Sequence, residues 1–131
     1  ASWFKNSIFF DMIKYLSSKK IPIIITTDHG TIKIQKSIKV VGDKNINANL
    51  RYKVGRTLDY PANQVFEMKN PEEFFLPKEG VTHRYIFASN SDFFAYPNNY
   101  NQYVNYYKNT FQHGGISMEE IIIPFIRLSA K

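Results

Sequence analysis

The sequence predicts an α/β fold, because an amphipathic helix is followed at once by a short, continuously apolar strand. The segment IPIIITT, residues 21–27, is β-branched and uninterrupted, as in a strand that is buried on both faces of a parallel sheet. A helix followed by a buried strand is the order of elements typical of α/β proteins. The helix is predicted over about residues 6–20 from apolar residues at helical spacing, which are Ile8, Phe9, Met12, Ile13 and Leu16.

Strands of mixed exposure are predicted further along the chain. Residues 31–41 alternate apolar and polar side chains, which predicts a half-exposed strand. Residues 42–64 are polar and irregular, and VFEM at residues 65–68 predicts a short strand. The last apolar run, residues 121–128, predicts a closing strand in which Pro124 implies a sheet edge or a bulge.

Turn and cap signals complete this outline of the fold. RYIFAS and DFFAYP flank a Ser-Asn-Ser turn and predict a β-hairpin over residues 84–97. Asn70 and Pro71 are typical of the N-cap and first position of a short helix. Ser117 and Glu120 have the spacing of a capping box. Another helix is predicted from the helical spacing of Tyr100, Tyr103, Val104 and Tyr107.

The composition excludes several classes of protein. The chain of 131 residues contains no cysteine, which rules out disulfides and thiolate metal sites and fits a cytoplasmic protein. No apolar run approaches the ~20 residues that a membrane span requires. The first residues lack the basic and apolar regions of a secretory signal. We therefore expect a cytoplasmic protein without a membrane partner.

The net charge of +6 is unevenly distributed along the chain. Residues 1–60 contain 11 Lys and Arg against 4 Asp and Glu, whereas residues 61–131 contain 6 against 7. A basic half attracts phosphate groups or nucleic acid. A solvated, lysine-rich surface accounts for the same composition, so charge alone leaves both interpretations open.

The segment TTDHGT places a carboxylate and an imidazole directly after the predicted buried strand. Ligands of open α/β sheets bind beyond the carboxyl ends of the strands, where Asp28 and His29 would lie. Zinc accepts these oxygen and nitrogen ligands, and manganese also takes such sites. Gly30 would let a ligand or another loop approach the backbone. Alternatively, Asp28 caps a turn and His29 packs beneath it.

The segment FQHGGIS places His113 beside two glycines. This pattern is typical either of a tight turn or of a position that another group approaches closely. His83 is a useful comparison, because it precedes Arg84 at the start of a predicted strand and has neither a glycine nor an acidic neighbour. We therefore interpret His83 as an ordinary surface or strand histidine.

Arg51 and the tyrosines of residues 96–107 each allow two interpretations. The planar guanidinium of Arg51 could hold a phosphate, and it could equally cap a loop or pair with Asp43 or Asp59. The tyrosines pack at the edge of a core with their hydroxyls in water, or they form a platform on which nucleic-acid bases stack.

The two histidine motifs together resemble those of the alkaline phosphatase superfamily of metal-dependent phosphoryl-transfer enzymes. More narrowly, the chain is similar to the C-terminal part of a PglZ domain, and most of all to the PglZ domain that follows a receiver domain in PorX-type response regulators of Bacteroidetes. The resemblance runs from the first helix to the last strand, and it implies an alkaline-phosphatase-like α/β/α sandwich whose C-terminal portion has a mixed sheet and a β-hairpin. It rests on the segments ITTDHGTI, LRYKVGR, VFEMKNPEEFFLP and FFAYPNNYNQYVNYYKNTFQHGGISMEEIIIP.

This resemblance implies a two-metal site, usually of zinc, with manganese as the alternative. Asp28 and His29 would ligate the metal that also binds the nucleophile, and His113 would ligate the second metal. The glycines after His113 would then leave room for the metal-bearing loops and the phosphate. The family's Thr or Ser nucleophile and further metal ligands precede the DHG motif, and residues 1–27 contain no such motif. We therefore expect residues 1–131 to be a C-terminal piece of the domain, with no catalytic nucleophile of its own, weak metal binding and little activity.

The resemblance implies a metal-dependent phosphatase or phosphodiesterase that acts on nucleotides or oligonucleotides and serves as the output domain of a response regulator behind a receiver domain. An alternative is a non-catalytic regulatory module that controls secretion or transcription. A plain nucleic-acid-binding module is disfavoured, because the basic residues are scattered and no recognised binding motif is present. If strand 21–27 has an unpaired edge, the chain would also be prone to form homodimers.

Overall fold

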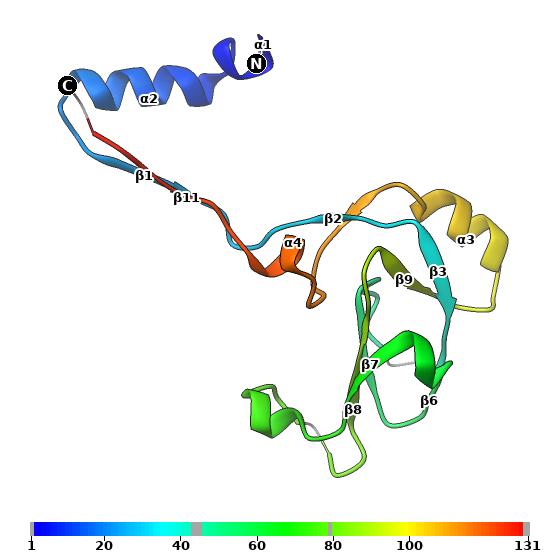
Figure 1. Ribbon diagram of the computed structural model, residues 1–131. Helices are drawn as coiled ribbons and strands as arrows, with labels where there is room; N and C mark the ends of the chain where they lie inside the picture. Colours follow the sequence, from blue (N-terminus) through cyan, green and yellow to red (C-terminus); the bar gives the residue numbers. More distant parts are fainter. Residues whose placement is uncertain (1, 43–45, 79, 130–131) are drawn as a thin grey trace. The chain divides into compact units, whose positions relative to one another are not determined.

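The computed structural model describes residues 2–42, 46–78 and 80–129, which form two compact units (Figure 1). Unit 1 contains the chain up to Asp28 and again from Ile123, and unit 2 contains His29–Ile122. Among the described residues, no helix is both long and apolar enough to cross a membrane. The prediction of one domain over residues 1–131 stays a prediction, and each unit is described by itself below.

Unit 1 consists of two helices and a two-stranded ribbon. The predicted first helix is confirmed as α2, and Ser7 caps it by accepting a hydrogen bond of 3.2 Å from the Phe10 N–H. The ribbon pairs β1 with β11 in antiparallel register, with Ile23 opposite Leu128 (Figure 1). The elements of this unit are α1 (Ser2–Lys5), α2 (Ile8–Ser18), β1 (Ile23–Thr26) and β11 (Phe125–Leu128).

The prediction of a parallel strand buried on both faces is wrong for β1. Its partner among the described strands is β11, which runs antiparallel, and its residues alternate between half-buried and exposed. Ile24 is 60% exposed. Burial on both faces requires packed layers above and below a strand, and a two-stranded ribbon provides neither. The strand predicted over residues 121–128 is confirmed from Phe125 onward, because Ile121 belongs to a helical turn and Pro124 precedes the ladder.

Unit 2 is built from small ladders of strands. Its largest sheet is antiparallel with β8 at the centre, and β3 pairs with β9 in parallel. Two short ladders pair β2 with β10 and β4 with β6. The strands are β2 (Ile32–Lys33), β3 (Lys36–Lys39), β4 (Val41–Gly42), β5 (Tyr52–Gly55), β6 (Leu58–Asp59), β7 (Val65–Met68), β8 (Arg84–Ala88), β9 (Asp92–Ala95) and β10 (Phe111–Gln112).

Of the helices of unit 2, η2, α3 and α4 begin where the sequence signals predict, whereas η1 lies in a stretch predicted to be irregular. The first residue of η2 is Pro71 after an Asn70 N-cap, and Ser117 and Glu120 form the predicted capping box on α4. One face of α3 packs against a cluster of buried residues that includes Ile34 and Phe93. The helices are η1 (Ala62–Gln64), η2 (Pro71–Phe74), α3 (Tyr100–Tyr107) and α4 (Met118–Ile121).

The apolar alternation of residues 31–41 forms much of the core of unit 2. The segment bends between β2, β3 and β4 instead of forming one continuous strand, yet the alternation of burial persists through the bends. The apolar side chains on one face therefore pack inward while the lysines between them stay exposed. The buried members are Ile32, Ile34, Ile38 and Val40.

The predicted β-hairpin over residues 84–97 is wrong. The turn itself exists, since the Asp92 N–H donates a hydrogen bond of 3.0 Å to the Ser89 carbonyl and Asn90 has a positive φ of 45°. However, β8 already has β5 on one side and β7 on the other, so neither of its edges is open to β9. The turn instead leads the chain into a different sheet, where β9 pairs with β3.

Candidate functional site

Two predicted metal ligands, His29 and His113, stack on each other in unit 2. Their ring centroids are 3.7 Å apart and their planes differ by 12°. The β2–β10 ladder places Ile32 opposite Gln112, the residue before His113, so the two loops meet at the end of that ladder. The structure therefore brings together two residues that are distant in the sequence.

The orientation of the His29 ring is set by a carbonyl group beside it. Its Nδ1 lies 2.8 Å from the Gly30 carbonyl oxygen. Because a carbonyl oxygen only accepts hydrogen bonds, Nδ1 carries the proton, and the lone pair of the neutral ring is on Nε2. This is the arrangement by which proteins commonly orient a metal-binding histidine.

Gly30 allows the two histidine loops to approach each other. Its N–H donates a hydrogen bond of 2.8 Å to the Glu120 carbonyl. A Cβ at this position would lie 1.9 Å from the Glu119 carbonyl oxygen, which leaves no room for any side chain. Of the two expectations for Gly30, the approach of another loop is therefore confirmed.

The two glycines after His113 have a different neighbourhood from the one expected. Gly114 has a φ of 99°, and a Cβ there would lie 2.6 Å from Nδ2 of Asn49. A Cβ on Gly115 would lie 2.6 Å from a carboxylate oxygen of Glu120. In this structure the space beside these glycines is therefore filled by protein side chains rather than kept open for a phosphate.

Glu120 ties the His113 loop to the core through a buried ion pair with Arg51. The Arg51 guanidinium donates from Nε to Oε1 and from Nη2 to Oε2, both at 2.9 Å. The same carboxylate accepts hydrogen bonds from the Gly115 N–H at 2.9 Å, and from the Ser117 N–H at 3.2 Å and hydroxyl at 2.7 Å. Burial by itself would raise the pKa of Glu120, but Arg51, Ser117 and Gly115 outweigh it and leave this pKa below its usual value.

Asn49 holds the backbone of His113 itself. Its Nδ2 donates a hydrogen bond of 3.3 Å to the His113 carbonyl, and its Oδ1 accepts from the N–H groups of Arg51 at 2.7 Å and Tyr52 at 3.2 Å. We call Asn49, Arg51 and Glu120 the loop anchor. No pattern in the sequence points to Asn49, and Glu120 is predicted only as part of a helix cap, because its partner Arg51 is far away in the chain.

The environment of Arg51 differs from the predicted substrate contact. Its side chain has no exposed surface, and its nitrogens donate to Glu120 and to the Asp92 carbonyl. Arg51 therefore forms an ion pair, as one alternative predicted, but with Glu120 instead of Asp43 or Asp59. Asp43 lies outside the described residues. A phosphate could reach the guanidinium only by displacing Glu120, so the structure lends no support to direct substrate binding by Arg51.

The described residues do not by themselves form a complete metal site. Within residues 2–42, 46–78 and 80–129, no three His, Asp or Glu side chains are grouped as metal ligands. Asp28, which is exposed, is the last residue of unit 1 before His29 begins unit 2. The donor chemistry of the two imidazoles suits zinc or manganese, but a closed zinc site takes four ligands.

His83 and the tyrosines of residues 96–107 are the remaining candidates, and most of them have positions that a structural role explains. His83 directly precedes β8, as the sequence predicted, and its Nδ1 is buried without a hydrogen-bond partner among the described residues. Tyr100, Tyr103 and Tyr107 pack against the core of unit 2, so the core-edge interpretation holds for these three. Tyr106 is 74% exposed.

The comparison with known families agrees with the histidine motifs. The family model of the BREX system PglZ alkaline phosphatase-like domain matches residues 3–128. A search of curated proteins gives no match to the chain. Since the family model spans both units, including the DHG and HGG segments, the chain belongs to the PglZ family of alkaline phosphatase-like domains.

Proposed function

We propose that this chain provides part of the two-metal centre of a phosphoester hydrolase. Asp28 and His29 would ligate one ion and His113 the other, with zinc as the metal and manganese as the alternative. The observation that carries this proposal is the contact between the two histidine rings. The family also leads us to propose that the whole domain has the α/β/α sandwich of alkaline phosphatases.

The geometry of the ring pair favours two ions over one. An imidazole binds a metal in the plane of its ring at about 2.0–2.1 Å. The centroids of the two rings are 3.7 Å apart and their planes differ by 12°, so the two imidazoles lie face to face and do not converge edge-on toward one point. The ring pair would therefore offer one imidazole to each ion of a two-metal site.

The residues of the chain would then bind and orient the reacting groups. Two ions held by these residues would supply positive charge that neutralises the phosphate and stabilises the attacking and leaving oxygens. His29 offers Nε2 because the Gly30 carbonyl holds the proton on Nδ1. The loop anchor keeps His113 in place through its backbone, which limits the reorganisation that metal binding would need.

Nucleotides or oligonucleotides are the proposed substrates. Lys33, Lys36 and Lys39 are exposed in unit 2, where the bends of the chain leave them between buried apolar residues. Exposed lysines attract polyanions over a Debye length of about 8 Å at physiological salt. A phosphodiester chain is the class of substrate that would benefit most from this attraction.

Metal analysis of purified protein tests the proposal. The chain, and any longer natural form that contains it, would be prepared without chelator, assayed for zinc and manganese, and tested on a nitrophenyl phosphodiester. We expect weak binding by the chain, loss of metal in Asp28→Ala and His113→Ala, and retention in the control His83→Ala. Hydrolysis should follow metal content. Equal metal content in all variants, or no metal in any form of the protein, would overturn the proposal.

A second candidate is a regulatory output module whose dimerisation is controlled by an attached receiver domain. Its support is the apolar surface of unit 1, where no residue of α2 is buried and Ile8 is 82% exposed. An apolar helix face of this kind is typical of an interaction surface. Light scattering of the wild type and of Ile8→Lys tests it: a homodimer that the substitution dissociates supports the regulatory module, and a monomer at all concentrations contradicts it.

A further inference from the structure

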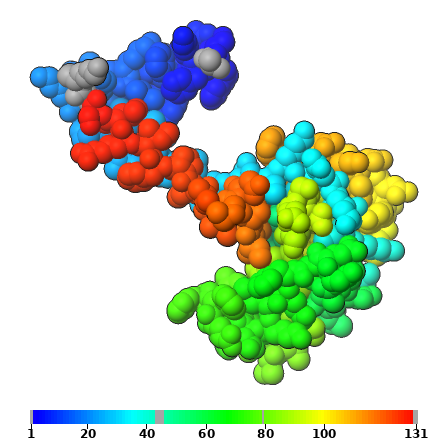
Figure 2. Space-filling view, in the orientation of Figure 1, coloured from blue at the N-terminus to red at the C-terminus, as the bar shows by residue number. Residues whose placement is uncertain are grey.

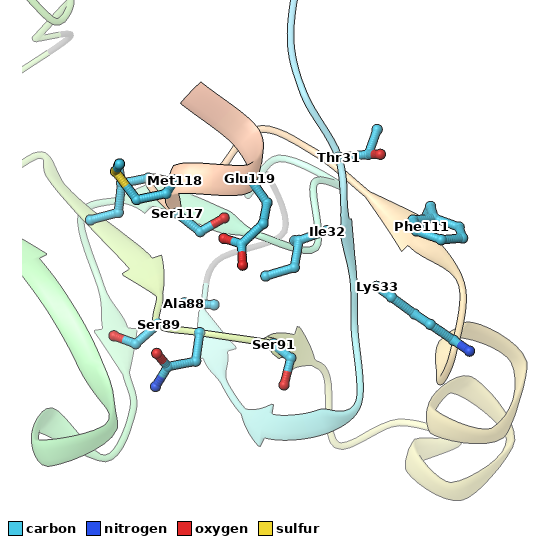
Figure 3. Close-up of a pocket in the computed structure, with 12 residues that line it drawn as sticks. Thr31, Ile32, Lys33, Ala88, Ser89, Ser91, Phe111, Ser117, Met118 and Glu119 are labelled. Carbon is cyan, nitrogen blue, oxygen red and sulfur yellow. The ribbon is translucent and has the colours of Figure 1, made fainter. Parts of the chain in front are cut away.

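A cavity of about 770 Å³ in unit 2 lies between the segments that flank the two histidines (Figure 3). One wall follows His29 in the sequence, a second wall comprises the residues on either side of the His113 loop, and the third is the turn between β8 and β9. Figure 2 shows the orange atoms of α4 close to the yellow-green atoms of this turn. The residues used below are Lys33, Ser89, Ser91, Phe111, Ser117, Met118 and Glu119.

The α4 wall of the cavity accepts hydrogen bonds. The Glu119 carboxylate points into the cavity (Figure 3), and in the described part of the chain it has neither an ion pair nor a hydrogen bond. The Ser117 hydroxyl donates its hydrogen to the Glu120 carboxylate and accepts from the Glu120 N–H, so one lone pair of its oxygen is left for a ligand. In Figure 3 the Lys33 side chain extends away from Glu119 and leaves the carboxylate unneutralised.

The opposite wall is a fixed turn that carries hydroxyl groups. The Gln35 N–H donates a hydrogen bond of 2.7 Å to the Ser91 carbonyl, and the Asp92 N–H donates one of 3.0 Å to the Ser89 carbonyl. The backbone of both serines is thereby held, while their side chains line the cavity (Figure 3). Hydroxyl groups donate as well as accept, so this wall complements a ligand that does both.

An apolar surface completes the cavity. Phe111 and Met118 are each 67% exposed, and both line it. A flat aromatic face beside hydrogen-bonding groups suits a sugar ring or a base, whose faces are apolar and whose edges are polar.

We infer that this cavity binds the organic part of the phosphoester, namely a sugar that carries vicinal hydroxyls, with the Glu119 carboxylate accepting both hydroxyl hydrogens. The Glu119 carboxylate repels a phosphate, whereas Lys33 attracts one from the far side of the lining, so the phosphate would lie away from Glu119. Acidic side chains bind ribose hydroxyls in the same way in dinucleotide-binding folds. This inference rests on the proposed hydrolase function for its biological meaning, but the binding itself needs no metal.

The test is the binding of adenosine and 2′-deoxyadenosine, which carry no phosphate, to the whole chain in metal-free buffer, followed by protein-detected NMR. We expect adenosine to bind about tenfold more tightly than its deoxy analogue, since a hydrogen bond to a charged group is lost in the latter. Amide shifts should centre on the segments around Ser89 and Glu119.

Glu119→Gln should abolish the discrimination, while the exposed control Glu73→Gln should retain it. Ser91→Ala, which replaces a side chain of the other wall, should weaken both ligands.

The absence of adenosine binding at millimolar concentration, or equal discrimination in Glu119→Gln, would overturn the inference. Failure of the metal proposal would give a different result. The protein would bind no metal and hydrolyse no phosphodiester, while it would still prefer adenosine to 2′-deoxyadenosine. If both hold, Glu119→Gln should raise KM for a ribonucleoside phosphodiester several-fold, with unchanged metal content and little change in kcat.

Discussion

Asn49 and Glu120 position His113 through backbone groups of its loop rather than through its imidazole ring. Asn49 holds the His113 carbonyl, and Glu120 holds the Gly115 N–H just beyond it. Both are in turn fixed by Arg51, through its N–H and its guanidinium. The buried ion pair satisfies five donors with one carboxylate, so its value lies in the geometry that it imposes on the loop.

Replacement of Asn49 with alanine should loosen the His113 loop. The variant loses the bond to the His113 carbonyl and leaves the N–H groups of Arg51 and Tyr52 without their acceptor, at a cost of about 1–3 kcal/mol. We expect a lower free energy of unfolding and loss of the ring-to-ring contact in NMR spectra. Asn105→Ala, on an exposed position of α3, is the matched control. An unchanged His29–His113 contact in Asn49→Ala would contradict the positioning role.

Glu120 should make stability fall at acid pH. Its pKa is lowered in the folded chain, so the unfolded chain takes up the proton first, and stability decreases as the pH drops below about 4 and through the folded pKa. Glu120→Gln should lose this dependence and cost about 3–5 kcal/mol at neutral pH, because Arg51 stays buried without its counter-charge. Urea unfolding between pH 3 and pH 7 measures both effects, and an unaltered pH profile in the variant would rule out this source.

At the scale of elements, short ladders and backbone contacts bring the two histidine loops together. The β2–β10 ladder has only two pairs of residues, and the Gly30 N–H bond to the Glu120 carbonyl adds the next contact. Neither the two-residue ladder nor this single hydrogen bond is stable alone, because so few contacts do not compensate for the loss of chain entropy. The loop anchor is therefore needed to hold the site in shape.

A side chain at Gly30 should separate the loops. The Cβ of Gly30→Ala would meet the Glu119 carbonyl oxygen at 1.9 Å, and since that atom is backbone, α4 would have to shift. We expect a loss of about 1–3 kcal/mol in stability and weaker metal binding. Gly80→Ala is the control, because the nearest atom to its Cβ would be on a side chain at 3.2 Å. Equal metal affinity in the two variants would show that the close contact is unimportant.

At the scale of the whole molecule, burial is concentrated in unit 2. Every buried apolar residue described by the structure lies between Ile32 and Ala95, whereas the helices and ribbon of unit 1 contain none. Unit 1 thus relies on hydrogen bonds that are close to solvent. Such bonds open more readily than those within a packed core.

Hydrogen exchange should reveal this difference. We expect the amides of the β1–β11 ribbon to exchange at least about tenfold faster than those of β8, whose two neighbours and buried side chains protect it. Exchange measured by NMR or mass spectrometry on the intact chain reports both in one sample. Equal protection of the two units would mean that β1 and β11 are covered in solution, as a dimer would cover them.

The sequence by itself determined the local elements of this protein and the chemistry of its loops. The helical spacing of α2 and α3, the capping box at Ser117 and the alternation that begins at Ile32 depend on neighbours in the chain, so they could be predicted. The DHG and HGG segments likewise indicated the family that the matching model supports.

Only the tertiary structure decided which segments pair and what surrounds each site residue. The local signals for a buried parallel strand and for a hairpin were misleading, because a continuous apolar run and a tight turn do not specify the partner of a strand. The sequence leaves Arg51 available to a phosphate, whereas the tertiary structure pairs it with Glu120. These outcomes depend on contacts between residues far apart in the chain, whose free energies no local pattern records.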